Sequence, residues 1–283
     1  MARTPKARAL GAALREARES KRLLLREVAA AVSRDIGVVS RWETGDRTPK
    51  PEQVAQILTK LGVEGNRYDE IMTLAYGTNE SLWVATTLPE QRQQMVAYID
   101  WEQNATSIVE VAPLLIPGLL QTTEYIQAIM TGGGVLPGEI AARVASRIGR
   151  REIITKNRPA DLLVLLGHAA LRQDIGGKQV TLEQMKHLLD MAKRPNITLR
   201  IMPDHGGWHP GLEGAFSCIK SKATPARPAA SIVFVGTRRS VLMLHEDNDV
   251  AAYENAIQMI IQKSLPPETS LALIADFAER LER

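Results

Sequence analysis

The chain has 283 residues, of which 45% are apolar, so it can build two domains with separate cores. Its single cysteine, Cys218, excludes an internal disulfide and a zinc site with several cysteine ligands, and it suits a reducing cytoplasm. No run of about 18 apolar residues occurs, so we expect no membrane-spanning helix, and we expect no signal peptide at the basic N-terminus.

Positive charge is concentrated near the N-terminus. Residues 1–60 hold 13 Lys and Arg against 7 Asp and Glu, whereas the remaining residues hold 22 against 25. We therefore expect a small basic domain that contacts a polyanion and a larger, slightly acidic domain that does not.

The first 76 residues contain five segments with apolar residues at helical spacing. Residues 1–8 precede them as a basic arm, which either contacts phosphate or is a disordered tail. Pro51 suits the first position of the fourth helix, and Asn66 can cap the fifth. The expected helices span about 10–20, 25–32, 35–43, 51–61 and 66–76.

Residues 25–45 have the spacing of two short helices joined by a tight turn. Val28 and Val32 share one face of the first helix, and Val39 and Trp42 share one face of the second. This pattern predicts that the two helices bury these faces against a common core.

Three residues fit the ends and the crossing of these two helices. Asp35 is a favourable N-cap for the second helix, and Gly45 suits the position just after its end. Ala29 is small enough to allow a steep crossing over a short turn.

The stretch RDIGVVSRWETGDRTPKPEQVAQIL resembles the helix-turn-helix of regulators of the xenobiotic-response-element (XRE) type. That family combines a small-residue turn, a polar helix start, an S-R-W-E-x-G motif, a basic loop with proline and a further amphipathic helix. The resemblance implies an all-α, lambda-repressor-like five-helix bundle that places the second motif helix in the DNA major groove. The alternative is an ordinary helical hairpin with a core tryptophan.

The resemblance also implies which side chains face DNA. Arg41 matches a position that points into the groove, where arginine can contact guanine O6 and N7, although it can instead contact only phosphate. Ile36 can only pack on a thymine methyl, and Gly37 has no side chain for reading a base. The expected base-reading residues are Ile36, Gly37, Ser40 and Arg41, and the expected phosphate contacts are Arg26, Arg34, Thr44, Arg47 and Lys50.

Two residues depart from the family pattern. Ser33 stands where glycine is common, at a turn position that favours positive φ, so we expect some strain there. Leu25 stands where the family often has a phosphate-contacting Gln or Thr. Phosphate contacts at this end are therefore weaker, or they come from Lys21, Arg22 and Arg26.

Residues 77–87 are expected to be a linker, and residues 88–283 an α+β domain with a mixed sheet. Leu162–Leu166 is a continuous apolar run between Pro159 and Gly167, which is typical of a buried strand. We expect helices at about 88–103, 117–130, 137–156, 181–193, 249–263 and 267–281. We expect strands at about 107–111, 162–166, 197–202, 215–220, 232–235 and 241–244.

The stretches PLLIPGLLQTTEYIQAIM, RREIITK, HAALRQDIGG, PNITLRIMP and HPGLEGAFSCI resemble the C-terminal domain of Scr-type antitoxin-like transcriptional regulators of actinobacteria. Proteins of that family join such a domain to a helix-turn-helix. The resemblance implies no defined chemical activity, but it raises the possibility that the domain sequesters a small protein.

Two loops of the larger domain are candidates for binding a partner or ligand. They are residues 116–120 and 205–214, which combine Gly or Pro with apolar or aromatic residues. Rigid loops of this kind can form a contact surface with little loss of entropy, or their large side chains can fold into the core. The candidate partner or ligand residues are Leu119, His205, Trp208 and His209.

The histidines of the second loop and the cysteine also admit chemical interpretations. His205 and His209 are four apart, as in some zinc sites, but the glycines and prolines around them favour a loop, and a structural turn is the default. Cys218 lies in an apolar strand, which favours burial over nucleophilic reactivity. We expect no metal and no cofactor, because no P-loop, dinucleotide-binding or nucleophile-elbow motif occurs.

Together these patterns predict a cytoplasmic, sequence-specific DNA-binding transcriptional regulator that forms a homodimer on operator DNA. Its larger domain is expected to carry the dimer interface and to sense a protein partner or a small-molecule effector. One alternative is an antitoxin that sequesters a small protein. Another is an enzyme with a regulatory DNA-binding domain, which the absence of paired catalytic groups disfavours, so we expect no enzyme.

Overall fold

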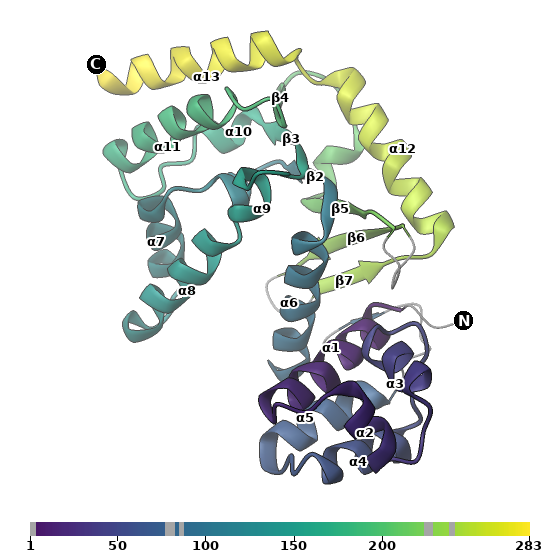
Figure 1. Cartoon of the computed structure of the whole chain (residues 1–283). Helices are drawn as coiled ribbons and strands as arrows, with labels where there is room; N and C mark the ends of the chain where they lie inside the picture. The colour runs from purple at the N-terminus through teal and green to yellow at the C-terminus, as the bar shows by residue number, and fades with distance from the viewer. Residues whose placement is uncertain (1–3, 77–82, 85–87, 224–228, 238–240) are drawn as a thin grey trace. The chain divides into compact units, whose positions relative to one another are not determined.

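A computed structural model describes residues 4–76, 83–84, 88–223, 229–237 and 241–283 (Figure 1). The chain divides into two compact units. The first is Met1–Trp101 with Lys222–Asp247, and the second is Glu102–Ser221 with Asn248–Arg283. The compact units are thus not continuous in sequence, unlike the predicted domains. Of the predicted linker, only residues 83–84 lie within the described part of the chain.

The first unit contains the five expected helices. They are α1 (Pro5–Ser20), α2 (Leu25–Ala31), α3 (Ile36–Glu43), α4 (Pro51–Lys60) and α5 (Gly65–Ala75). The apolar stripes predicted from helical spacing form their common core, because each helix turns its stripe inward. Fully or nearly fully buried members are Leu10, Leu14, Val28, Val39, Trp42, Val54, Ile57, Leu58, Ile71 and Leu74.

Two details of these helices differ from expectation. The basic arm is shorter, because α1 already begins at Pro5, with the Thr4 hydroxyl accepting a hydrogen bond from the Ala7 N–H at 3.0 Å. Arg8 is buried, and its guanidinium lies 4.1 Å from the ring centre of Trp101. Asn66 is not the cap of α5, because that helix already starts at Gly65.

The first unit also contains strands from distant parts of the chain. Strand β7 (Val241–Leu244) pairs antiparallel with β1 (Trp83–Val84) and with β6 (Ala230–Gly236). Helix α6 (Leu88–Gln103) is tied to them, since the Gln94 amide donates a hydrogen bond to the Val241 carbonyl at 2.8 Å.

The second unit contains a mixed sheet in the order β5-β2-β3-β4. Strands β2 (Ala105–Ala112), β3 (Asp161–Gly167) and β4 (Ile197–Met202) are parallel, and β5 (Phe216–Ser221) runs antiparallel to β2. The run Leu162–Leu166 is the buried central strand that its composition predicted. The α+β fold with a mixed sheet is confirmed.

Helices connect and cover these strands. Two predicted helices are each broken in the structure: 117–130 is a 3-10 turn (Gly118–Leu120) followed by α7 (Thr123–Gly132), and 137–156 is α8 (Pro137–Gly149) followed by α9 (Glu152–Thr155). The others are α10 (His168–Leu171), α11 (Lys178–Met191), a 3-10 turn (Pro210–Leu212), α12 (Asp247–Lys263) and α13 (Pro267–Glu282). Helices α11 and α13 pack together (Figure 1). Among the described residues, no helix is long and apolar enough to cross a membrane.

Candidate functional site

The turn between α2 and α3 sets the direction of α3. Ser33 adopts φ 53°, the left-handed conformation that its place in the turn predicted. The next residue, Arg34, donates its backbone N–H to the Ala29 carbonyl at 2.9 Å. Ala29 itself is buried, so a larger side chain there would push the two helices apart.

Both ends of α3 are fixed by residues that the sequence identified. The Asp35 carboxylate accepts a hydrogen bond from the Gly37 N–H at 2.7 Å and so caps the first turn. After the last turn, Gly45 adopts φ +74°, and a Cβ atom there would lie 2.8 Å from the Cα of Arg8. Helix α1 therefore passes so close to the end of α3 that only glycine fits.

A buried ion pair also holds α3 against α1. The Arg18 Nε and Nη2 atoms donate hydrogen bonds to the two Glu43 carboxylate oxygens at 2.7 and 2.8 Å. The side chains are 11% and 7% exposed. The hydrogen bond to Glu43 raises the pKa of Arg18 above its ordinary value. Glu43 was recognised as part of the sequence motif, but its partner, 25 residues earlier, was not.

The opposite face of α3 is open to solvent. Ile36 is 50% exposed, Arg41 is exposed, and Gly37 and Ser40 are partly exposed. The structure thus brings the four expected base-reading residues together on one face. A Cβ atom at Gly37 would lie 3.4 Å from the Arg41 Nη1 atom, so Gly37 leaves room for that guanidinium.

Exposed cationic side chains lie before and after α3 along the chain. Arg26, Arg34, Arg47 and Lys50 are exposed, and none of them forms an ion pair within the described part of the chain. Thr44 differs from these residues, because its hydroxyl donates to the Asp46 carboxylate at 2.8 Å. A phosphate contact from Thr44 would require that hydrogen bond to break.

Two short helices joined by a tight turn, the second of them with an exposed outer face, are the arrangement of a helix-turn-helix DNA-binding domain. In agreement, residues 9–71 match the family described as Helix-turn-helix domain. Residues 95–276, well over half of the chain, match the family described as Domain of unknown function (DUF5753), and the chain belongs to that family. No curated protein and no solved structure matches the chain.

Two of the four expected partner or ligand residues are buried, so the prediction that they lie on a contact surface is wrong. Leu119 is 1% exposed because the 3-10 turn at Gly118–Leu120 directs it into the core. His209 is 2% exposed and packs beside Gly211, where a Cβ atom would lie 2.9 Å from the His209 Nδ1. Burial lowers the pKa of His209, with a smaller effect from Lys263.

The other two partner candidates remain accessible. Trp208 is 63% exposed, and His205 is exposed. Since His209 is buried and His205 is not, the two histidines do not form a pair on one surface. Within the described residues, no group of three or more His, Cys, Asp and Glu could hold a metal ion. Burial raises the pKa of Cys218 to about 11, which disfavours the thiolate.

The structure adds a polar cluster that the sequence did not predict. At the carboxyl ends of the parallel strands β3 and β4, His168 Nδ1 lies 2.8 Å and Arg172 Nη2 lies 2.9 Å from the Asp204 carboxylate. The hydrogen bond with His168 lowers the pKa of Asp204. His168 and Arg172 belong to a stretch that was noticed as a family signature, but Asp204 lies 36 residues beyond His168.

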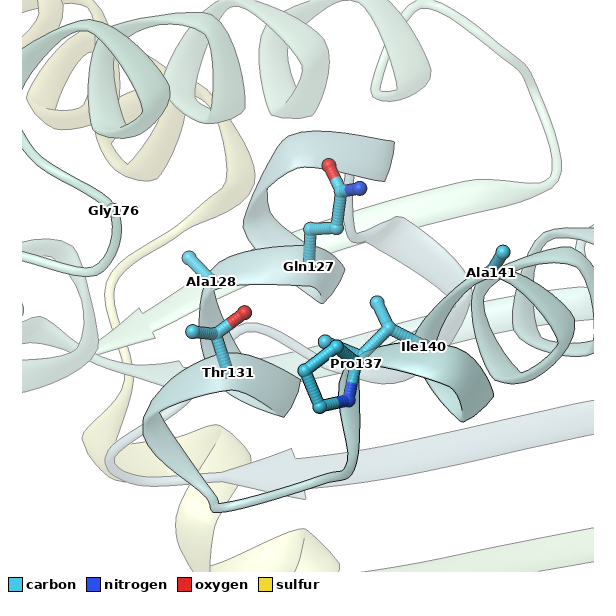
Figure 2. Close-up of a pocket in the computed structure, with 7 residues that line it drawn as sticks. All are labelled: Gln127, Ala128, Thr131, Pro137, Ile140, Ala141 and Gly176. Atoms are coloured by element: carbon cyan, nitrogen blue, oxygen red, sulfur yellow. The ribbon is translucent and has the colours of Figure 1, made fainter.

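A pocket of about 540 Å³ lies between α7 and α8. Figure 2 shows that side chains of the two helices face each other across it and that Gly176, from a separate loop, borders one side. None of the expected partner or ligand residues lines it. Its lining residues are Gln127, Ala128, Thr131, Pro137, Ile140, Ala141 and Gly176.

Proposed function

We propose that the protein is a sequence-specific transcriptional regulator that reads operator DNA with the exposed face of α3. The observation that carries the proposal is the position of Arg41 on that face, next to Gly37 and between exposed cations. Arginine recognises guanine through two parallel hydrogen bonds in the major groove, whereas the surrounding cations contact phosphate and carry no sequence information.

The test compares Arg41→Ala with Arg34→Ala on a site selected from random DNA and on unselected DNA. Loss of a bidentate base contact costs about 1–3 kcal/mol, so Arg41→Ala should weaken binding to the selected site about tenfold to a hundredfold and change binding to unselected DNA little. Arg34→Ala should weaken both equally. Equal losses from Arg41→Ala on both DNAs would make it a phosphate contact and refute base reading.

Salt dependence tests the surrounding cations. Each phosphate contact releases about one counterion, so Arg47→Ala should reduce the slope of log affinity against log salt by roughly one. An unchanged slope would remove Arg47 from the DNA interface.

We further propose that the larger domain forms a homodimer and senses a protein partner or small ligand, and that the protein works beside DNA in the cytoplasm. One module reads few base pairs, and a dimer doubles the site. The resemblance to XRE-type regulators and to actinobacterial antitoxin-like proteins supports this assignment. Exposed Trp208 is the residue we assign to partner contact. The proposal assigns no catalytic step to either domain.

A further inference from the structure

Arg151 has no counter-ion among the residues that the structure describes. It lies in the turn between α8 and α9, and its Nη2 donates a hydrogen bond to the Gln121 carbonyl. Its Nε is buried without a hydrogen-bond partner, and no acidic side chain pairs with Arg151 within the described residues. Burial lowers the pKa of the guanidinium.

The preceding residue, Arg150, differs from Arg151 because it is paired with a carboxylate. Arg150 donates hydrogen bonds from Nε and Nη2 to the two Glu102 carboxylate oxygens, both at 2.7 Å. A half-buried cation that lacks such a partner is destabilising, because it has lost part of its hydration without gaining an opposite charge. The fold keeps Arg151 in this position all the same, beside an arginine that is paired.

The neighbours of Arg151 include a second arginine and a histidine. Gln121 accepts a second hydrogen bond, through its side-chain oxygen, from Arg147 Nη1 at 3.0 Å. His187 on α11 is partly buried, and its Nε2 has no partner. Burial lowers the pKa of His187, and the charge of Arg151 lowers it further. Asp190, also on α11, acts on His187, but it is paired with Lys193 at 2.7 Å.

We propose that Arg151, Arg147 and His187 form a binding site for an oxyanion, namely the carboxylate or phosphate group of a small molecule. The planar guanidinium of arginine matches two oxygens of such a group, and the anion supplies the negative charge that would pair with Arg151. The site belongs to the second compact unit, whereas the residues that we assign to DNA belong to the first. Its use as an effector site rests on the sensing role proposed above, whereas the binding itself does not.

The test titrates the full-length protein with inorganic phosphate and, separately, with acetate, and follows the imidazole NMR signals of His187. Sodium chloride at the same ionic strength is the reference. We expect saturable shifts with at least one oxyanion. If phosphate binds more tightly than acetate, the ligand carries a phosphate group, and if acetate binds more tightly, the ligand carries a carboxylate. Arg151→Gln should weaken that affinity at least tenfold. Arg143→Gln removes an exposed charge from α8, the helix that precedes Arg151, and should leave the affinity unchanged.

Arg151→Lys serves as a second variant in case Arg151→Gln does not fold. Lysine keeps the charge but cannot present the planar pair of donors, so the affinity should again fall. Equal shifts with chloride, no saturation with either oxyanion, or full affinity in Arg151→Lys would overturn the proposal. None of these results would contradict the proposed DNA binding, which is tested with Arg41→Ala and DNA.

Discussion

Removing Arg18 should loosen the helix that reads DNA. The Glu43 side chain, which is 7% exposed in the native structure, loses both short hydrogen bonds in Arg18→Met. Breaking a buried pair in this way costs about 3–5 kcal/mol. Arg15, whose Nε is 3.9 Å from Glu43, remains as a weak second partner, so we expect about 3 kcal/mol, near the lower end of that range.

Amide hydrogen exchange in the full-length protein measures this loss where it occurs. The N–H groups of Val39 and Trp42, on the buried face of α3, report the free energy of opening that helix. A loss of about 3 kcal/mol corresponds to exchange about a hundredfold faster. Exchange in the core of the other compact unit, for example at Leu165 in β3, is the internal reference and should not change.

A double variant separates the unpaired charge from lost packing. In Arg18→Met with Glu43→Leu no charge is left buried, and apolar replacements of buried pairs are often neutral, so most of the protection should return. If exchange in the single variant rises less than threefold, the ion pair does not hold α3. If the double variant exchanges as fast as the single one, the cause is packing and not an unpaired carboxylate.

Four further outcomes are expected. Gly45→Ala should destabilise α3 by at least about 2 kcal/mol, because the position combines a positive φ with a backbone clash. Gly65 also has a positive φ but has open space around it, so Gly65→Ala should cost about 1 kcal/mol. The melting temperatures of the two variants measure the difference. Ser33→Gly should stabilise the turn by up to about 1 kcal/mol, measured by slower exchange in α3. Cys218 should resist iodoacetamide until the protein unfolds. Because burial raises the pKa of its thiol to about 11, the contribution of Cys218 to the free energy of unfolding is present below pH 9 and is lost between pH 9 and 11. Light scattering of the full-length protein at micromolar concentration should give a dimer, and a monomer would contradict the proposed assembly.

The DNA-binding helices were predictable because their determinants are local. The Asp35 cap, the Ser33 turn and the end at Gly45 are set by residues a few positions apart, and Val39 with Trp42 marks the inner face. The breaks in the later helices also had a local signal, since the Thr122 hydroxyl accepts a hydrogen bond from the Tyr125 N–H and so starts α7. Apolar residues at helical spacing continue across Thr122 and hide this signal in the sequence.

The remaining errors and omissions depend on contacts between distant residues. The elements that pack around each loop, and not the composition of the loop, decide whether its large side chain is exposed. Leu119 is buried, whereas Trp208 is exposed. Likewise the pair Arg18–Glu43 and the cluster of His168 and Asp204 join residues 25 and 36 positions apart. One sequence holds many such charged pairs, and only the fold selects among them.

The discontinuous first compact unit has a consequence for how the protein is made. Its helices α1–α5 are synthesised first and pack on one another, but strands β6 and β7 of the same unit end only at Leu244. At about 5–20 residues per second, a ribosome needs roughly 7–30 seconds to extend the chain from Trp101 to Asp247. During that interval Gln94 lacks its hydrogen-bond partner Val241, and the segment Glu102–Ser221 of the second unit is synthesised before the first unit is complete. The first unit is therefore complete only after the segment from Lys222 to Asp247 has been synthesised.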